Sequence, residues 1–348
     1  MKPRSLLVAL ALSAPLAMLA QPTQARDLTV VNFGGANGDA QLAAFIKPFE
    51  AESGKKVIPV AYNGEQAKVK AMVQAHNVVW DAVEVETGDL GRGCDEGTYE
   101  KIDWTKILDK NDMVPGALKY CGVGTFVWST VLAYNGDALK TAPTSWADFW
   151  NVKKFPGKRG LRKGAHYNLE FALMADGVAP QDVYKVLATP AGVDRAFKKL
   201  DELKPNIQWW EAGAQPPQML AAGDVVMSSA YNGRIDAAQR EGRKNLKISW
   251  PGSVYDFDYW VIPTGSANKQ QAIDFVKYAA SPKAQAAYSQ HIAYGPISKK
   301  AIGMLSPDVL AKVPNSPANA KGALFNNLEF WTDHGEELEQ RFTAWAAR

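Results

Sequence analysis

The sequence predicts an α/β protein with two lobes, in which central sheets are flanked by helices and a hinge and a cleft separate the lobes. Three observations support this fold class. Short β-branched strands alternate with amphipathic helices in the first half of the chain. Roughly 320 residues follow the leader, which is more than one hydrophobic core usually serves. Two later strand-like runs, near 127–135 and 248–263, are positioned to cross between the lobes.

The first 25 residues are predicted to be a secretory signal peptide (1–25) that is not part of the fold. Lys2 and Arg4 precede an uncharged run from Ser5 to Ala20, and small residues lead to a cleavage point after Ala25. The apolar run is too short and too rich in alanine for a comfortable membrane span. We therefore expect a soluble periplasmic protein, and the lack of a cysteine at the cleavage point argues against a lipid anchor.

The part of the chain that follows the leader alternates strands with helices. The expected elements are a strand over 27–35, a helix over 40–52, a strand over 56–61, a helix over 64–76 and a strand over 80–85. Strands that alternate with helices in this way predict a parallel sheet covered on both faces.

The middle of the chain departs from this alternation. The expected elements are a crossing strand over 127–135, helices over 145–152, 168–176, 180–187 and 190–203, a strand ending at 209–210, a helical turn over 218–222 and a strand over 225–230. Residues 155–164 are basic and are interrupted by glycine and proline, so we expect them to form a loop.

The last third of the chain is expected to return to the first lobe and then finish on the second. The expected elements are return segments over 248–251 and 255–263, followed by helices over 268–280, 282–290, 299–311 and 329–346. Each lobe would then be discontinuous. Residues 26–134 plus 255–300 would form the first lobe, and residues 135–254 plus 301–348 the second.

Charge and cysteine content narrow the classes of partner. The formal net charge is only +3, and basic and acidic residues are interspersed, so nucleic acid and anionic lipid are poor candidates. The four histidines lack the sequence spacing of metal ligands, and we expect no metal and no cofactor.

Cys94 and Cys121 reach an oxidising compartment, which favours a disulfide that stabilises the fold by about 3 kcal/mol. Two unpaired buried thiols are the alternative.

Six stretches, taken in their order and spacing, carry a resemblance over essentially the whole mature chain. They are Phe33-Gly34-Gly35, Trp80 to Glu84, Leu132 to Asp137, Tyr231 to Arg234, Trp250 to Asp258 and Tyr294 to Ser298. In these stretches the sequence resembles the periplasmic spermidine/putrescine-binding proteins of ABC importers, and more narrowly their relatives that bind 4-aminobutyrate and similar ω-amino acids. The resemblance implies a type II periplasmic binding protein fold, a monomer, a small solute bound in the cleft and an inner-membrane ABC permease as partner.

The resemblance also implies which residues bind the solute. Tyr231 occupies the position of an aromatic side chain that stacks on the ligand, and Asp258 that of a carboxylate that binds an ammonium. Phe33 and Tyr294 match aromatic positions of the cleft, and Glu86 falls in a loop that contributes polar contacts.

Further site residues come from strand geometry and from the same resemblance. Asp256 lies two residues from Asp258 and therefore on the same side of a strand. Trp210 matches an aromatic position of the family, whereas its neighbour Trp209 points to the opposite face and is expected in the core. Gly35, at the end of the first strand, is placed in the site with them.

The departures from the polyamine-binding pattern concern charge. Polyamine binders place acidic residues at the start of a helix of the second lobe, and the matching stretch Gly164 to Tyr167 has none. Arg162 and Lys163 precede it instead. Arg234 stands where those proteins have a small neutral residue. The site has therefore exchanged an anion for a cation.

An arginine in this position could hold a ligand carboxylate with both ends of its planar fork. The alternative is a helix-surface arginine paired with Asp236 or Glu241, and for Asp258 the alternative is a surface or loop-capping carboxylate. We expect a zwitterionic ω-amino acid, 4-aminobutyrate or 5-aminovalerate. A polyamine such as putrescine, spermidine or agmatine is the alternative ligand, and a sensor-coupled role without transport is the alternative function.

An enzyme is not expected. The sequence has no nucleophile elbow, no zinc-protease helix motif and no phosphate-binding loop. Asp256 and Asp258 could form a carboxylate pair, but alternate residues of one strand do not flank a glycosidic bond.

Overall fold

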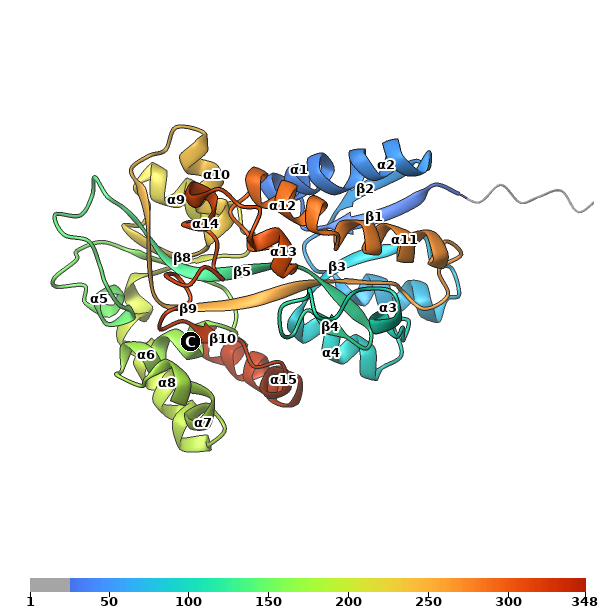
Figure 1. The fold of residues 1–348 in the computed structure, drawn as a ribbon. Coiled ribbons are helices and arrows are strands. Elements are labelled where there is room, and N and C mark those ends of the chain that lie inside the picture. Colours follow the sequence, from blue (N-terminus) through green and yellow to red (C-terminus); the bar gives the residue numbers. More distant parts are fainter. Residues whose placement is uncertain (1–25) are drawn as a thin grey trace, which may run out of the picture.

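The computed structural model describes residues 26–348, and the predicted signal peptide lies outside the described residues. One ten-stranded sheet passes through both halves of the molecule (Figure 1), and its main path runs β2-β1-β3-β9-β5-β8-β6-β7. The strands are β1 (Leu28–Asn32), β2 (Val57–Ala61), β3 (Ala82–Glu86), β4 (Leu118–Lys119), β5 (Gly122–Asn135), β6 (Arg159–Arg162), β7 (Ile207–Trp210), β8 (Met227–Tyr231), β9 (Leu246–Val261) and β10 (Leu324–Phe325). Within 26–348, no helix has the length and the apolar character that crossing a membrane requires.

The first lobe has the parallel sheet that its alternating pattern predicts. β1 pairs in parallel with β2 and with β3, and all five residues of β1 are buried. The surrounding helices are α1 (Gly35–Gln41), a π-helical turn (Leu42–Ile46), α2 (Lys47–Ser53), α3 (Gln66–Gln74), α4 (Thr87–Asp95), α11 (Lys269–Ala279) and α12 (Pro282–His291). Phe45 stacks on Tyr288 of α12, and Phe49 contacts Phe275 of α11, so these helices form one layer.

Two long strands carry the chain between the lobes. β5 and β9 pair antiparallel from Gly122 opposite Val261 to Asn135 opposite Leu246. β9 joins the two predicted return segments into one strand. Pro251 lies where the register shifts, a position that tolerates a residue without a backbone N–H. The predicted crossings are confirmed, and they lie side by side.

The second lobe contains a strand that the sequence interpretation missed. Residues 155–164 were expected to be a loop, and this is wrong for Arg159–Arg162, which form β6 and pair in parallel with β7 and β8. Arg159 is fully buried because its guanidinium donates hydrogen bonds to the carbonyl groups of Phe149, Phe155 and Gly157. The helices of this lobe are α5 (Trp146–Trp150), α6 (Asn168–Ala175), α7 (Val183–Leu187), α8 (Pro190–Leu203), α9 (Gln215–Ala222) and α10 (Asn232–Arg240).

The C-terminal segment also differs from expectation. The helix expected over 299–311 is wrong, because two short helices, α13 (Lys299–Ile302) and α14 (Pro307–Leu310), stand there. Pro307 starts α14, and the Ser306 side chain accepts a hydrogen bond from the backbone of Val309, so this proline begins a helix and does not lie inside one.

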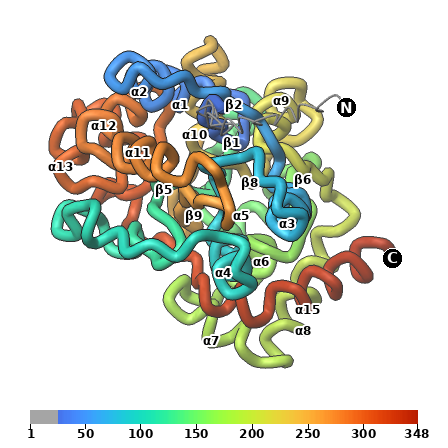
Figure 2. Tube along the Cα trace, turned by 90° about the vertical axis from the view of Figure 1, so that its right-hand side faces the viewer, coloured from blue at the N-terminus to red at the C-terminus, as the bar shows by residue number. Residues whose placement is uncertain are grey.

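The last helix, α15 (Leu328–Ala346), touches both halves of the molecule. It packs on α4 of the first lobe, and its Phe342 meets Trp209 of the second. Figure 2 shows α15 running past both α4 and α8. The exact lobe boundaries, 26–134 plus 255–300 and 135–254 plus 301–348, therefore stay a prediction.

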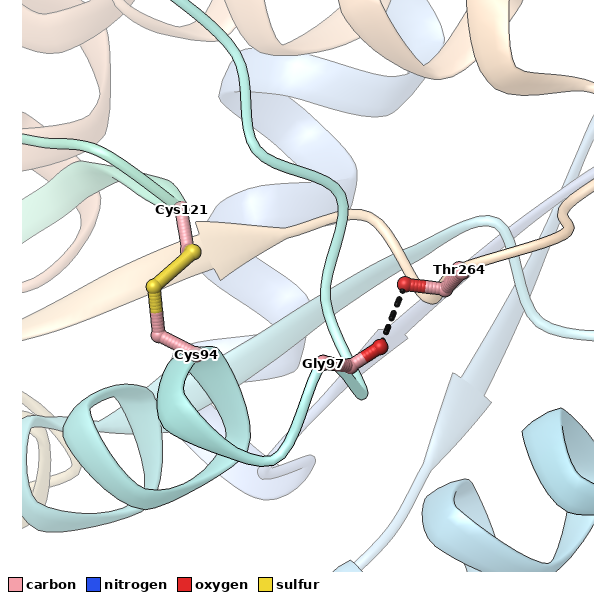
Figure 3. Close-up of a disulfide and its surroundings, with 4 residues drawn as sticks. All are labelled: Cys94, Gly97, Cys121 and Thr264. Atoms are coloured by element: carbon pink, nitrogen blue, oxygen red, sulfur yellow. Dashed lines mark hydrogen bonds between the residues drawn. A yellow bond between two sulfur atoms is a disulfide. The ribbon is translucent and has the colours of Figure 1, made fainter.

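Cys94 of α4 and Cys121 form a disulfide across a sequence separation of 27 residues (Figure 3), as predicted. A hydrogen bond of 2.8 Å from the Thr264 hydroxyl to the carbonyl of Gly97 ties down the loop that follows α4. The bridge joins the helix after β3 to the start of β5, and so fixes the first lobe at the point where the chain leaves it.

Replacing both Cys94 and Cys121 by serine should lower the free energy of unfolding by about 3 kcal/mol, because the bridge restricts the unfolded chain. Equilibrium urea denaturation measures this change. The wild-type midpoint should fall toward that of the variant when a reductant is added, whereas the variant should not respond. Equal midpoints without reductant would contradict the prediction.

Candidate ligand-binding site

A pocket lies between the lobes over the middle of β5 and β9. Most of the predicted site residues line it, namely Phe33, Glu86, Tyr231, Arg234, Asp258 and Tyr294. The space available to the centres of water-sized molecules is about 60 Å³. Since one water needs roughly 10–15 Å³ on this measure, the pocket is suited to a small solute.

Asp258 lies within β9, three residues before the end of the strand, with its side chain buried, and so it neither caps a loop nor lies on the surface. Its Oδ1 atom accepts a hydrogen bond of 2.6 Å from the indole N–H of Trp128. The carboxyl group of Glu84 lies on the same face of the sheet, because Glu84 is two residues along β3 from Glu86, which pairs with Asp258. Burial raises the pKa of Asp258 well above its ordinary value, and the charge of Glu84 raises this pKa further.

Arg234 is the third residue of α10 and is only 9% exposed. Its Nη2 atom donates to the carbonyl of Gly34 at 3.1 Å, which is a contact from the second lobe to the first. No carboxylate within 26–348 forms a salt bridge with Arg234. Asp236 pairs instead with Arg240 and Lys312. The guanidinium of Arg234 is therefore available to a ligand anion.

Gly35 lies beside the pocket and makes room for Arg234. Its φ is +54°, and a Cβ atom at this position would come within 2.6 Å of Nη1 of Arg234. A side chain here would both strain the backbone and displace the guanidinium.

Two aromatic residues that the sequence interpretation missed line the pocket. Phe126 and Trp128 alternate on β5, opposite Asp258 and Asp256 of β9. Phe126 stacks on Tyr294 at 4.7 Å between ring centroids, and Trp128 meets Tyr231 edge-on at 4.9 Å. Their alternation on a predicted crossing strand was the one available signal.

Trp210 does not line the pocket. It is 1% exposed and packs edge-on behind Tyr231, at 5.5 Å between ring centroids. It supports the ring of Tyr231 from β7 and cannot reach a solute. Trp209 packs against Phe342 and Trp345, on the core side where it was expected.

Asp256 is likewise outside the pocket, and its carboxylate is satisfied by hydrogen-bond donors of the protein. It accepts hydrogen bonds from the hydroxyl of Thr87, from the backbone N–H of Phe257 at 2.7 Å and from the amide of Asn326 at 2.6 Å. The Tyr167 hydroxyl adds a fourth contact. Burial raises the pKa of Asp256 to about 7. This residue ties both lobes and β10 to the hinge strand.

Glu86 and Arg162 form an ion pair across the cleft. Glu86 ends β3 in the first lobe and leads directly into α4, so the loop expected around it does not exist. Arg162 ends β6 in the second lobe, and its Nη1 atom lies 3.1 Å from Oε1 of Glu86. Burial lowers the pKa of Arg162, but the charge of Glu86, the nearby Tyr231 and Tyr167 and the hydrogen bond to Glu86 together outweigh burial and raise this pKa above its ordinary value.

Two lobes that share crossing strands, with a charged and aromatic pocket between them, define a solute-binding protein. Within the described residues, no three His, Cys, Asp or Glu side chains are grouped so that they could hold a metal ion. The family of bacterial extracellular solute-binding proteins matches residues 44–318, and the chain belongs to this family.

Individual relatives agree with this assignment. The chain is 59% identical over 329 residues to the gamma-aminobutyric acid-binding protein of Pseudomonas aeruginosa. This alignment covers 94% of this chain and 93% of that protein. It is 24% identical over 312 residues to the spermidine/putrescine-binding periplasmic protein of Escherichia coli, with 86% and 87% covered. The solved structure of a GABA receptor superposes with a TM-score of 0.83 and 34% identity, covering 93% of this chain and 98% of that one. The predicted resemblance and two-lobed fold are thereby confirmed.

The ion pair between Glu86 and Arg162 should help to hold the lobes closed. Such a pair contributes up to about 1 kcal/mol, so Glu86→Gln should shift the ligand-free protein toward open forms. Small-angle X-ray scattering should then give a larger radius of gyration than for the wild type. Lys163→Ala is the matched control, because its partner Glu211 belongs to the same predicted lobe. An unchanged profile for Glu86→Gln would contradict this role.

Proposed function

We propose that this protein binds a zwitterionic ω-amino acid, chiefly 4-aminobutyrate or 5-aminovalerate, in the periplasm and delivers it to an inner-membrane ABC permease. The observation that carries the proposal is that one pocket holds a carboxyl group, Asp258, and a guanidinium, Arg234, which has no carboxylate partner in the described part of the chain. An amino acid with its two charges at opposite ends of a short chain complements both groups.

Each end of such a ligand has a fitting partner. The ammonium can bind Asp258 among the rings of Trp128, Tyr231 and Tyr294, where cation–π contact in a desolvated pocket contributes about 2 kcal/mol. The carboxylate can bind both ends of the Arg234 fork. The methylene groups between them would lie along Phe126 and the aromatic walls.

The relatives support this choice of ligand. The Pseudomonas aeruginosa relative at 59% identity is named for gamma-aminobutyric acid, and so is the GABA receptor structure. The proposal is one of binding and not of catalysis, in keeping with the names of these relatives.

A polyamine fits the pocket less well. Its second ammonium would lie close to Arg234, and like charges buried together cost several kcal/mol. The other acidic residues that line the pocket already have basic partners, since Glu86 pairs with Arg162 and Glu211 with Lys163. A second ammonium would therefore compete with existing ion pairs.

Arg234→Ala should weaken binding of 4-aminobutyrate by at least about 2 kcal/mol while sparing a monoamine fragment, because only the carboxylate loses its partner. Asp258→Asn should also weaken binding of 4-aminobutyrate, because the ammonium loses its partner, and should spare a fragment that has only the carboxylate. Isothermal titration calorimetry measures both. Arg240→Ala is the control on the same helix, since Arg240 pairs with Asp236 outside the pocket. Tighter binding of putrescine or spermidine than of any ω-amino acid by the wild type would favour the polyamine alternative.

Gly35→Ala should reduce the affinity for 4-aminobutyrate at least about tenfold, because the new Cβ atom would push Arg234 away. Gly54→Ala is the matched control. Gly54 has a similar φ of +68° at the end of α2, with no atom within 4 Å of an added Cβ. Both variants should lose similar thermal stability, and only Gly35→Ala should lose affinity. Equal affinities of the two variants would exclude this role of Gly35.

A further inference from the structure

A second carboxyl group lies behind the one that faces the pocket. β3 pairs with β9 so that Glu86 lies opposite Asp258, which puts Glu84, two residues along β3, on the same face of the sheet and diagonal to Asp258. Glu84 is completely buried and Asp258 is 6% exposed. Two ionised carboxylates can only accept hydrogen bonds and they repel each other, so neighbouring buried carboxyl groups are stable together when they share one proton.

The hydrogen bonds that Glu84 and Asp258 accept from other side chains indicate which of the two carries this proton. The Asn37 amide donates to both oxygens of Glu84, at 2.9 and 3.2 Å, and the Gln41 amide donates at 2.7 Å. These donors stabilise a negative charge on Glu84. Among the residues that the structure describes, Asp258 accepts a hydrogen bond from Trp128 alone, through Oδ1, which leaves its other oxygen free to carry the proton.

The surroundings of the pair favour retention of the proton. Burial raises the pKa values of both carboxyl groups, and the charge of Glu84 raises that of Asp258 further. Two more carboxylates, Glu86 and Asp256, raise the pKa of Asp258, while Arg234 opposes the rise at Glu84. The other ionisable side chains around the pair include Arg162, Tyr62, Tyr231, Tyr259, Tyr288 and Tyr294.

We propose that Glu84 and Asp258 share one proton in the ligand-free pocket, and that the ammonium group of the ligand displaces this proton when it binds Asp258. The O–H bond of Asp258 breaks, the proton passes to the solvent buffer, and an N–H of the ammonium takes its place as donor. This step rests on the proposed function, because it needs a ligand with an ammonium group. Glu84 is then a positioning residue that acts on the ligand through Asp258.

The shared proton explains how the empty pocket can hold two buried acids. With one proton, the pair carries a single negative charge, which balances the unpaired charge of Arg234. The second negative charge develops only when a cation is present to stabilise it, since a nearby cation favours the ionised form of a carboxyl group. The charge of the pair therefore changes only when the ammonium group of the ligand is present.

The test is calorimetry of 4-aminobutyrate binding near pH 7 in buffers of different ionisation enthalpy, such as phosphate and Tris. The observed binding enthalpy should change with the ionisation enthalpy of the buffer. The slope of the first quantity against the second should correspond to release of about half to one proton per ligand. The affinity should rise with pH between about 6 and 8, up to about tenfold per pH unit at full release. Glu84→Gln should bind the ligand with almost no proton release.

Asp256→Asn is the control, because Asp256 is the neighbouring buried acid and lies outside the pocket. It should retain the proton release. Wild-type binding without release overturns the proposal and leaves the proposed function standing, and this measurement needs no variant. Release that persists in Glu84→Gln and disappears in Asp256→Asn also overturns it. If 4-aminobutyrate does not bind at all, the proposed function fails first, and this proposal fails with it.

Discussion

The antiparallel pairing of β5 with β9 is the interaction on which the rest of the structure depends. It is the longest ladder in the sheet, and it belongs to both lobes. Residues directly opposite each other in such a ladder lie about 5 Å apart. The register that puts Phe126 opposite Asp258 therefore places an aromatic ring beside an acid at the hinge itself. The floor of the pocket is part of the hinge, and the two lobes add walls such as Glu86 and Arg162.

The same strand carries two buried acids with opposite tasks, and their hydrogen bonds distinguish them. Asp256 is surrounded by four donors from the protein, which satisfy its carboxylate and connect the hinge to distant segments. Asp258 has one such donor, from Trp128, and faces the cavity. Burying a carboxylate without partners is costly, so an acid left short of donors at the hinge indicates a partner that comes from outside. Position along the strand alone does not separate the two.

The different hydrogen-bond partners of Asp256 and Asp258 also illustrate which features the sequence could predict and which it could not. The two crossings, the parallel sheet of the first lobe and the disulfide followed from local patterns and from the predicted secretory leader. The resemblance to the polyamine-binding family also placed Arg234 and Asp258 in one site. What the sequence could not reveal depends on contacts distant along the chain. Asn326, whose amide donates a hydrogen bond to Asp256, is 70 residues away from it in the sequence. Arg159 is basic and flanked by glycine, which is typical of exposed loops, and only three carbonyl groups of the folded lobe make its burial tolerable.

Closure and selectivity then have a common physical origin. Without ligand, the polar links across the cleft near the pocket include the Glu86–Arg162 pair and the hydrogen bond from Arg234 to Gly34, and each contributes modestly. A ligand can shift the balance between open and closed forms only by the difference in its affinity for them. Asp258 sits on the hinge and Arg234 on a helix of the second lobe. A solute that engages both at once gains most of its affinity in the closed form, so its length decides whether the lobes close on it.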